Sequence, residues 1–164
     1  MTAVKVHLER TIPAPPSKVY RAWLDPDLLI RWMAPVGFDV IRVEVDERVG
    51  GHYRIWHGAQ GTEAGGFDAE LLELVPDERI SFRWGFVGPE RREGPAYDST
   101  LTVTLRAEPG GGTKLTLVHE HLDELHEAMP EVAENVAPGW EQALDALTTT
   151  VTHPTVTDST RGSF

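Results

Sequence analysis

Histidine and carboxylate side chains gather in one short stretch of the sequence, where they could hold a metal ion. The stretch contains His119, Glu120, His121, His126 and Glu127. On a strand, His119 and His121 would share one face, while Glu120 would point to the other. The stretch also lacks the two-residue spacer that sets two histidines one helical turn apart in zinc-binding HExxH motifs. We therefore predict no metal site. We place only His119 near the interior, on the same face as Leu117.

Carboxylates and arginines alternate along three candidate strands in the middle of the chain. Asp68 and Glu70 are two residues apart, so they share a face and could form an acid/base pair. Arg54, Arg79 and Arg83 lie on neighbouring candidate strands and could bind the carboxylate of a ligand. The same pattern is more typical of cross-strand ion pairs on a solvated sheet face. We favour the ion-pair interpretation for all five side chains.

Large aromatic and aliphatic side chains are the best candidates for a binding site. Such rings pack a core, and they also form the usual wall of an apolar ligand pocket. We expect at least three of the rings to line a pocket. The predicted ligand contacts are Trp32, Met33, Trp56, Phe67, Phe82, Trp84, Leu101, Leu117, His119, Trp140 and Leu144.

Sequence signatures of a nucleophile or a cofactor are missing. The chain has no cysteine, which excludes disulfides, thiolate metal sites and cysteine nucleophiles. No serine lies in a Gly-x-Ser-x-Gly elbow. The glycine-rich stretch 58–66 lacks the Lys-Ser/Thr ending of a phosphate loop, and we predict that it forms a flexible rim over a cavity mouth. No catalytic residue, metal or cofactor is predicted.

The elements that must position these residues are predicted from hydrophobic periodicity. Alternation with a period of two predicts strands over residues 4–12, 38–45, 52–57, 67–74, 79–86, 97–105 and 113–119. Two short helices are expected between the first two strands, the second capped by Asp25. A short helical piece is expected over 124–136, and a longer helix from Pro138 to Val151. The pattern fits equally two helices or one helix kinked at Pro138. Short loops between successive strands favour antiparallel pairing.

The last helix sets the architecture, because Trp140, Leu144, Leu147 and Val151 form a single apolar stripe. A helix of about 13 residues is roughly 20 Å long and cannot cover about seven strands spaced ~4.8 Å apart. The sheet must therefore curl around the helix, which leaves room for a cavity. We predict an α+β fold in which residues 1–152 form one domain and residues 153–164 a flexible tail.

Composition narrows the range of partners. The formal net charge is −11, and an acidic domain repels phosphate backbones, so nucleic acid is not expected. No apolar run approaches the ~18 residues of a membrane span, and no signal peptide is evident, so we expect no membrane insertion and a cytoplasmic location. A homodimer is compatible with the sequence.

The order of elements and motifs resembles the START-like helix-grip superfamily (SRPBCC). Within it, the subgroup named after the activator of the heat-shock chaperone ATPase is most similar. The matching stretches are Ile12-Pro-Ala-Pro15, Val19 to Trp23, Asp25-Pro26, Gly50-Gly51-His-Tyr-Arg54, Val75 to Trp84, Gly112 to His119, and Gly139-Trp140. The resemblance spans roughly residues 3–151. It implies a helix-grip fold, with a curved antiparallel sheet of about six to seven strands wrapped on a long C-terminal helix.

Function follows from the resemblance only in outline, because this fold hosts carriers, cyclases, hydrolases and co-chaperone domains. The aromatic pattern without catalytic residues favours non-enzymatic binding of a small apolar or aromatic ligand, such as a lipid, a polyketide or a xenobiotic. A cyclase or hydrolase using a pocket His, Asp or Arg is the alternative. A protein-interaction role with a chaperone partner is a third hypothesis.

Overall fold

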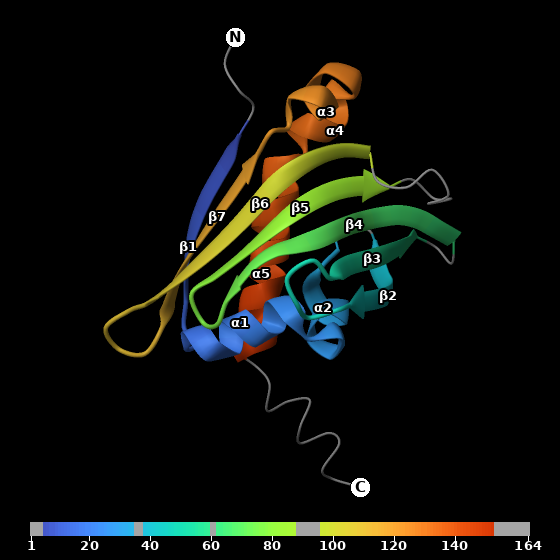
Figure 1. The fold of residues 1–164 in the computed structure, drawn as a ribbon. Coiled ribbons are helices and arrows are strands. Elements are labelled where there is room, and N and C mark those ends of the chain that lie inside the picture. The colour runs from blue at the N-terminus through green and yellow to red at the C-terminus, as the bar shows by residue number, and fades with distance from the viewer. Residues whose placement is uncertain (1–4, 35–37, 60–61, 88–95, 153–164) are drawn as a thin grey trace, which may run out of the picture.

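The computed structural model describes residues 5–34, 38–59, 62–87 and 96–152 (Figure 1). The strands are β1 (Val6–Ile12), β2 (Asp39–Val45), β3 (His52–Ala59), β4 (Thr62–Val75), β5 (Arg79–Val87), β6 (Ala96–Ala107) and β7 (Thr113–Glu120). The helices are α1 (Pro16–Leu24), α2 (Pro26–Trp32), α3 (Asp123–Ala128), α4 (Pro130–Glu134) and α5 (Val136–Thr152). The α+β fold is confirmed, with two short helices between β1 and β2.

The seven strands form one antiparallel sheet in the order β1-β7-β6-β5-β4-β3-β2. Every neighbouring pair is antiparallel, as the short loops predicted. Figure 1 shows that the sheet curves around α5, which crosses behind the strands in this view. Register irregularities in β2, β3, β4 and β5 coincide with this curvature, because a bulge bends the strand that carries it.

Prolines and a capping aspartate determine where helices α1 and α2 begin. Each has a proline in its first turn, where the missing amide hydrogen costs little. The carboxylate of Asp25 accepts a hydrogen bond of 2.9 Å from the backbone N–H of Asp27, so Asp25 caps α2 as predicted. These helices cover one end of the interior, where Val19, Trp23 and Leu29 are buried.

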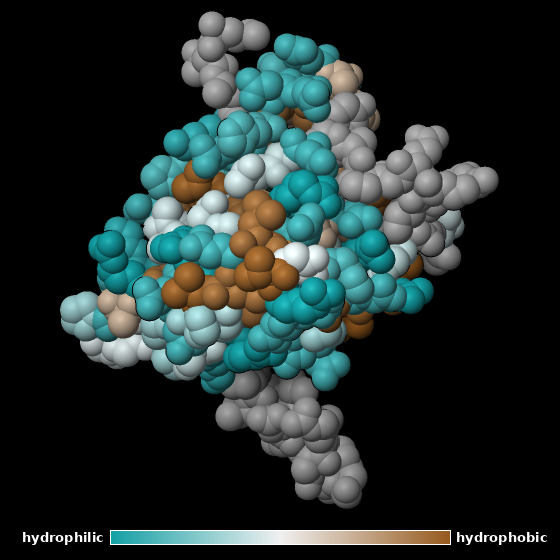
Figure 2. All heavy atoms as spheres, viewed as in Figure 1, coloured by the Kyte–Doolittle hydropathy of each residue, from teal (hydrophilic) through white to brown (hydrophobic). Residues whose placement is uncertain are grey.

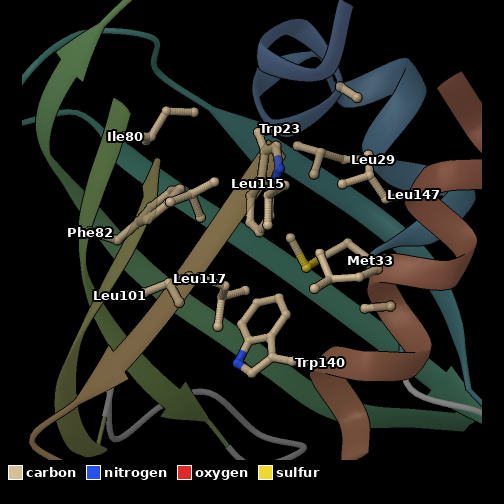
Figure 3. Close-up of a cluster of buried hydrophobic side chains, with 14 of the residues drawn as sticks. Trp23, Leu29, Met33, Ile80, Phe82, Leu101, Leu115, Leu117, Trp140 and Leu147 are labelled. Carbon is tan, nitrogen blue, oxygen red and sulfur yellow. The ribbon is translucent and has the colours of Figure 1, made fainter. Parts of the chain in front are cut away.

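The hydrophobic core lies between the concave face of the sheet and α5 (Figure 3). Sheet residues such as Phe82, Leu101 and Leu117 face Trp140 and Leu147 of the helix across this space. Period-two burial is nearly perfect in β7, whose inward side chains are fully buried and whose outward ones are half-buried. The alternating pattern in the sequence therefore corresponds to the inner and outer faces of the sheet.

Two expectations about irregular segments need correction. The stretch 58–66 is not a loop, because β3 continues to Ala59 and β4 starts at Thr62, and His57 pairs with Gly65 across the hairpin. The helical piece over 124–136 is two helices, α3 and α4, and α5 is separate from them. The C-terminal helix starts at Val136, so Pro138 lies in its first turn. The predicted tail, residues 153–164, lies outside the described residues.

No helix in the described part of the chain is both long and apolar enough to cross a membrane. The longest, α5, has 17 residues, and four of its last five residues are threonines.

Candidate functional site

The inner face of the sheet and the facing side of α5 carry a connected cluster of aromatic rings. The ring of Trp84 lies 4.8 Å from Phe67, 5.4 Å from Phe82 and 5.5 Å from Trp140, measured between centroids. Trp140 is also 5.9 Å from Trp23 of α1. Contacts at these separations stabilise a fold by about 0.5–1.5 kcal/mol per pair beyond the area they bury. The rings therefore form one wall that joins the sheet, α1 and α5.

This wall reaches the surface at one end of the sheet, through a set of rings that we name the aromatic rim: Phe38, His57, Phe67 and Phe86. Phe38 is 39% exposed, and Phe67 and Phe86 are half-buried. Between ring centroids, His57 lies 6.4 Å from Phe38 and 5.1 Å from Phe67, and Phe67 lies 6.0 Å from Phe86. The rim sits near the ends of β3 and β5, at the right of Figure 1. It leads directly to Trp84, which contacts Phe67.

A hydrogen-bond chain crosses the interior behind the rim. The indole N–H of Trp140 donates to Nδ1 of His119 over 3.1 Å. Nε2 of His119 lies 2.7 Å from Oγ of Ser99, and that hydroxyl donates to the carbonyl of Trp84 over 2.9 Å. Because Nδ1 accepts and the Ser99 proton is already donated, Nε2 must carry the imidazole hydrogen. Each member of this chain is buried.

His119 is held in the neutral state. Burial lowers its pKa from 6.5 to about 3, because the charged form would lose its hydration. Its neutral tautomer donates to Ser99 and so cannot withdraw the serine proton, as a nucleophile pair would require. The Ser99–His119 pair therefore orders the interior and is not arranged to activate a nucleophile.

Two buried indole N–H groups in this region have no hydrogen-bond partner in the described part of the chain. They belong to Trp23 and Trp84. By contrast, Trp32 donates to the carbonyl of Ala22 over 3.0 Å. Leaving a buried donor unpaired costs about 1–3 kcal/mol, and such a group calls for an unseen water or ligand.

Ten of the eleven predicted contact residues lie on the inside of the fold. Nine of them are fully or almost fully buried, and Phe67 is half-buried at the rim. They are Trp32, Met33, Phe67, Phe82, Trp84, Leu101, Leu117, His119, Trp140 and Leu144. The structure therefore brings most of the predicted set together in the interior, between the sheet and the helices.

Trp56 is the member of the predicted set that lies elsewhere. Its neighbours Ile55 and His57 are buried on the inner face, so Trp56 points to the outer face of β3. There the guanidinium of Arg42, its cross-strand partner, lies 4.7 Å from the ring centroid. Trp56 does not belong to the interior cluster.

The charged residues of the middle strands occupy the outer face, as favoured from the sequence. Arg54 pairs with Asp68 at 3.4 Å, and Arg83 with Glu70 at 3.5 Å. Two further ion pairs on this face join Arg83 to Asp98 and, through two hydrogen bonds, Arg79 to Glu73. The hydrogen bonds from Arg79 lower the pKa of the Glu73 carboxyl. Figure 2 shows that this face is mostly hydrophilic, with hydrophobic surface near its middle. The acid/base interpretation of these carboxylates finds no support in their placement.

A shallow pocket of about 140 Å³ opens between α2, the start of β2 and α5. Trp32 and Phe38 line it, together with Ile30, Arg31, Ala34, Asp39, Val40 and Ala146. Phe38 also belongs to the aromatic rim, so pocket and rim adjoin. Of the predicted contacts, Trp32 is the one that lines this pocket, although it is only 2% exposed.

The histidine cluster does not assemble into a metal site. Within the described ranges, no group of three or more His, Cys, Asp or Glu side chains is placed to hold a metal ion. The backbone turns at His121, where φ is +62°, and its ring lies 3.1 Å from the hydroxyl of Thr100 on the outer face. His119 and His121 therefore do not share a face, because the strand ends between them.

Several important interior residues were missed by the sequence analysis. Tyr53 is fully buried and donates to the carbonyl of Trp23 over 2.6 Å, and burial raises the pKa of its hydroxyl. Ser99 bonds His119 from a distance of 20 residues along the chain. Trp23 is fully buried in α1, and the predicted contacts did not include it. Period two alone could have placed Tyr53 inside, because it alternates with Arg54.

A curved antiparallel sheet closed over one long helix, with two short helices after the first strand, is the helix-grip arrangement of START-like (SRPBCC) domains. The sequence model of one family in this class, described as "Activator of Hsp90 ATPase homolog 1-like protein", matches residues 13–152. The chain belongs to that family.

Solved structures of other proteins have a similar fold. The protein CV1439 from Chromobacterium violaceum is 36% identical with a TM-score of 0.72, over 90% of this chain and 96% of that one. NE0264 from Nitrosomonas europaea is 23% identical with a TM-score of 0.73, over 92% and 96%. CalU16 from Micromonospora echinospora is 24% identical with a TM-score of 0.62, over 97% and 83%. The last two show the fold alone. No curated protein matches the chain.

Proposed function

We propose that this protein is a non-enzymatic binding protein for a small apolar or aromatic molecule of the lipid, polyketide or xenobiotic kind. The molecule would lie between the sheet and α5. The observation that carries this proposal is the ring wall, which runs from the partly exposed aromatic rim to the fully buried Trp84. Ligand sites are typically concave and lined by apolar and aromatic side chains with a few polar groups.

In this proposal the rim is the entrance through which the ligand would reach the interior. Phe67 and Phe86 are half-buried, so turning them outward costs less than moving a fully buried ring. Behind them, ring contacts fill the space between Trp84 and Trp140. Binding would therefore couple a turn of the rim side chains to insertion of the ligand against Trp84.

The polar groups of the interior favour binding over catalysis. Hydrolysis or cyclisation needs a base or a charged group aimed at the ligand. In the described interior the one buried pair of this kind, Ser99 and His119, is fixed in a neutral hydrogen-bond chain. The described arginines of the middle strands face outward, where they pair with carboxylates.

Titration of the purified protein with a panel of fatty acids, polycyclic aromatics and polyketide-like quinones tests the proposal. Replacing Trp56 by Phe removes the outer-face indole from the fluorescence signal, so the remaining change reports the interior. We expect saturable quenching in both the native protein and Trp56→Phe. We also expect Phe67→Ala to change affinity, whereas Leu72→Ala, at an exposed position on β4, leaves it unchanged. Absence of a saturable response to every panel member would refute the proposal.

A further inference from the structure

The unpaired indole N–H of Trp84 indicates the chemistry of the ligand. Trp84 has five ring neighbours: Tyr53, Phe67, Phe82, His119 and Trp140. Three of these rings carry polar atoms, and each is already engaged in another hydrogen bond. The N–H of Trp84 nevertheless has no acceptor in the described part of the chain. A buried donor in this position is explained if a bound molecule supplies the acceptor.

Trp84 is better placed for this role than Trp23, the other tryptophan with an unpaired N–H. Trp84 contacts Phe67 of the aromatic rim at 4.8 Å. The ring neighbours of Trp23 are Trp32, Phe82 and Trp140, none of which belongs to the rim. A ligand that entered past Phe67 would therefore meet Trp84 before Trp23.

The charge of the ligand is limited by the same surroundings. Among the described residues, no Asp, Glu, Lys or Arg side chain is buried. The buried polar side chains are His57, Ser99, Thr113, His119 and Thr150. An ionised ligand would lose its hydration there without a counter-charge, which is far more costly than burying an uncharged acceptor.

We propose that the binding site selects uncharged aromatic carbonyl compounds, with the indole N–H of Trp84 donating a hydrogen bond to the carbonyl oxygen of the ligand. This inference rests on the proposed function, since it assumes that a ligand occupies the interior. It makes Trp84 a residue that determines specificity and the rim a filter for flat, uncharged rings.

Three probes of matched shape test the selection: fluorene, 9-fluorenone and fluorene-9-carboxylate. Fluorene lacks an acceptor, fluorenone adds a carbonyl to the same three rings, and the carboxylate adds a charge. Affinities are measured by equilibrium dialysis, and the preference is the fluorene Kd divided by the fluorenone Kd. A hydrogen bond from the Trp84 N–H to the fluorenone carbonyl should make this preference about fivefold larger than in a protein without that N–H. The carboxylate should bind at least about tenfold more weakly than fluorenone.

Two matched variants separate the hydrogen bond from general packing. Trp84→Phe keeps a ring and removes the N–H, so we expect the preference for fluorenone to fall about fivefold while fluorene binding changes little. Trp56→Phe makes the same change on the outer face and should leave the preference unaltered. An unchanged preference in Trp84→Phe would overturn this inference. If the protein still binds both fluorene and fluorenone, the proposed function stands. Binding of none of the three probes by the native protein would overturn the inference, and the wider panel then decides whether the proposed function fails as well.

A measurement on the native chain covers the case in which Trp84→Phe does not fold. Labelling tryptophan with ¹⁵N gives a resonance for each indole N–H, and the Trp84 resonance is assigned in the native protein from its contacts to Phe67. Fluorenone should move the Trp84 N–H proton downfield, and fluorene should not. A downfield shift already present without ligand, and unaltered by fluorenone, would mean that a buried water satisfies this donor, and the inference would be wrong.

Discussion

The two faces of the same sheet differ in almost every physical property. On the inner face, Phe82 and Trp84 are fully buried among other rings. On the outer face, Arg83, which lies between them in sequence, pairs with Glu70 and Asp98. Both faces carry a tryptophan, yet the outer Trp56 stacks with Arg42 while the inner Trp84 lies among rings alone. The position of a residue in the period-two pattern, more than its type, therefore decides whether it faces the interior.

Replacing an inner residue should have the largest effect. Phe82→Ala is expected to lower the free energy of unfolding by about 3–5 kcal/mol, because it removes a ring that is 0% exposed and leaves a cavity. Its sequence neighbour on the other face supplies the control, and Arg83→Ala should cost less than about 1 kcal/mol. Urea denaturation of both variants measures the contrast. Equal losses would mean that the two faces do not differ as described.

Acid should act mainly on the inner face through His119. Because its folded pKa is about 3 and its ordinary pKa is 6.5, the unfolded chain binds the extra proton between these values. This contribution to stability is complete above pH 6.5 and is lost as the pH falls towards 3, by at most about 1.4 kcal/mol per pH unit. The stability difference between the native protein and His119→Gln should therefore shrink over that range. His52→Gln, on the exposed face of β3, is the control. A difference that stays constant from pH 7 to pH 4 would contradict a neutral, buried His119.

Loss of an ion pair on the outer face should have the smallest effect. The Arg54–Asp68 contact is 3.4 Å long and partly solvated, so Arg54→Met is expected to change the free energy of unfolding by less than about 1 kcal/mol. The small contribution of this ion pair to the free energy of unfolding should decrease in 1 M salt, where exposed charges are screened. Chemical denaturation by urea at low and high salt measures both effects. A larger, salt-independent loss would show that this face contributes more than surface charge.

Much of the fold was predictable from the sequence because its signals are local. The alternation of Ile80, Phe82 and Trp84 with Arg79, Ser81 and Arg83 predicted both the strand and its inner face. The stripe that contains Trp140 and Leu144 located the final helix. The stretch 58–66 was predicted wrongly, because its glycines suggested a loop. Instead they lie on an antiparallel hairpin, where Gly65 and Gly66 adopt positive φ angles of 100° and 151° beside a register shift.

The site was less predictable because its defining contacts join distant parts of the chain. The large ring of Trp56 suggested a wall residue, but Tyr53 and Ile55 set the inward face of β3. No local pattern pairs Ser99 with His119, or leaves the N–H of Trp84 unpaired. These features arise only when β5, β6, β7 and α5 are packed together.

The central claim is that a ligand binds against the inner face, between the rim and Trp84. The most direct test is to record intermolecular nuclear Overhauser effects between 9-fluorenone and the isotopically labelled protein. We expect cross-peaks from the probe to the ring protons of Phe67, Trp84 and Trp140, and none to Trp56. Cross-peaks to Trp56 or to other residues of the outer face, without any to Trp84, would contradict the account.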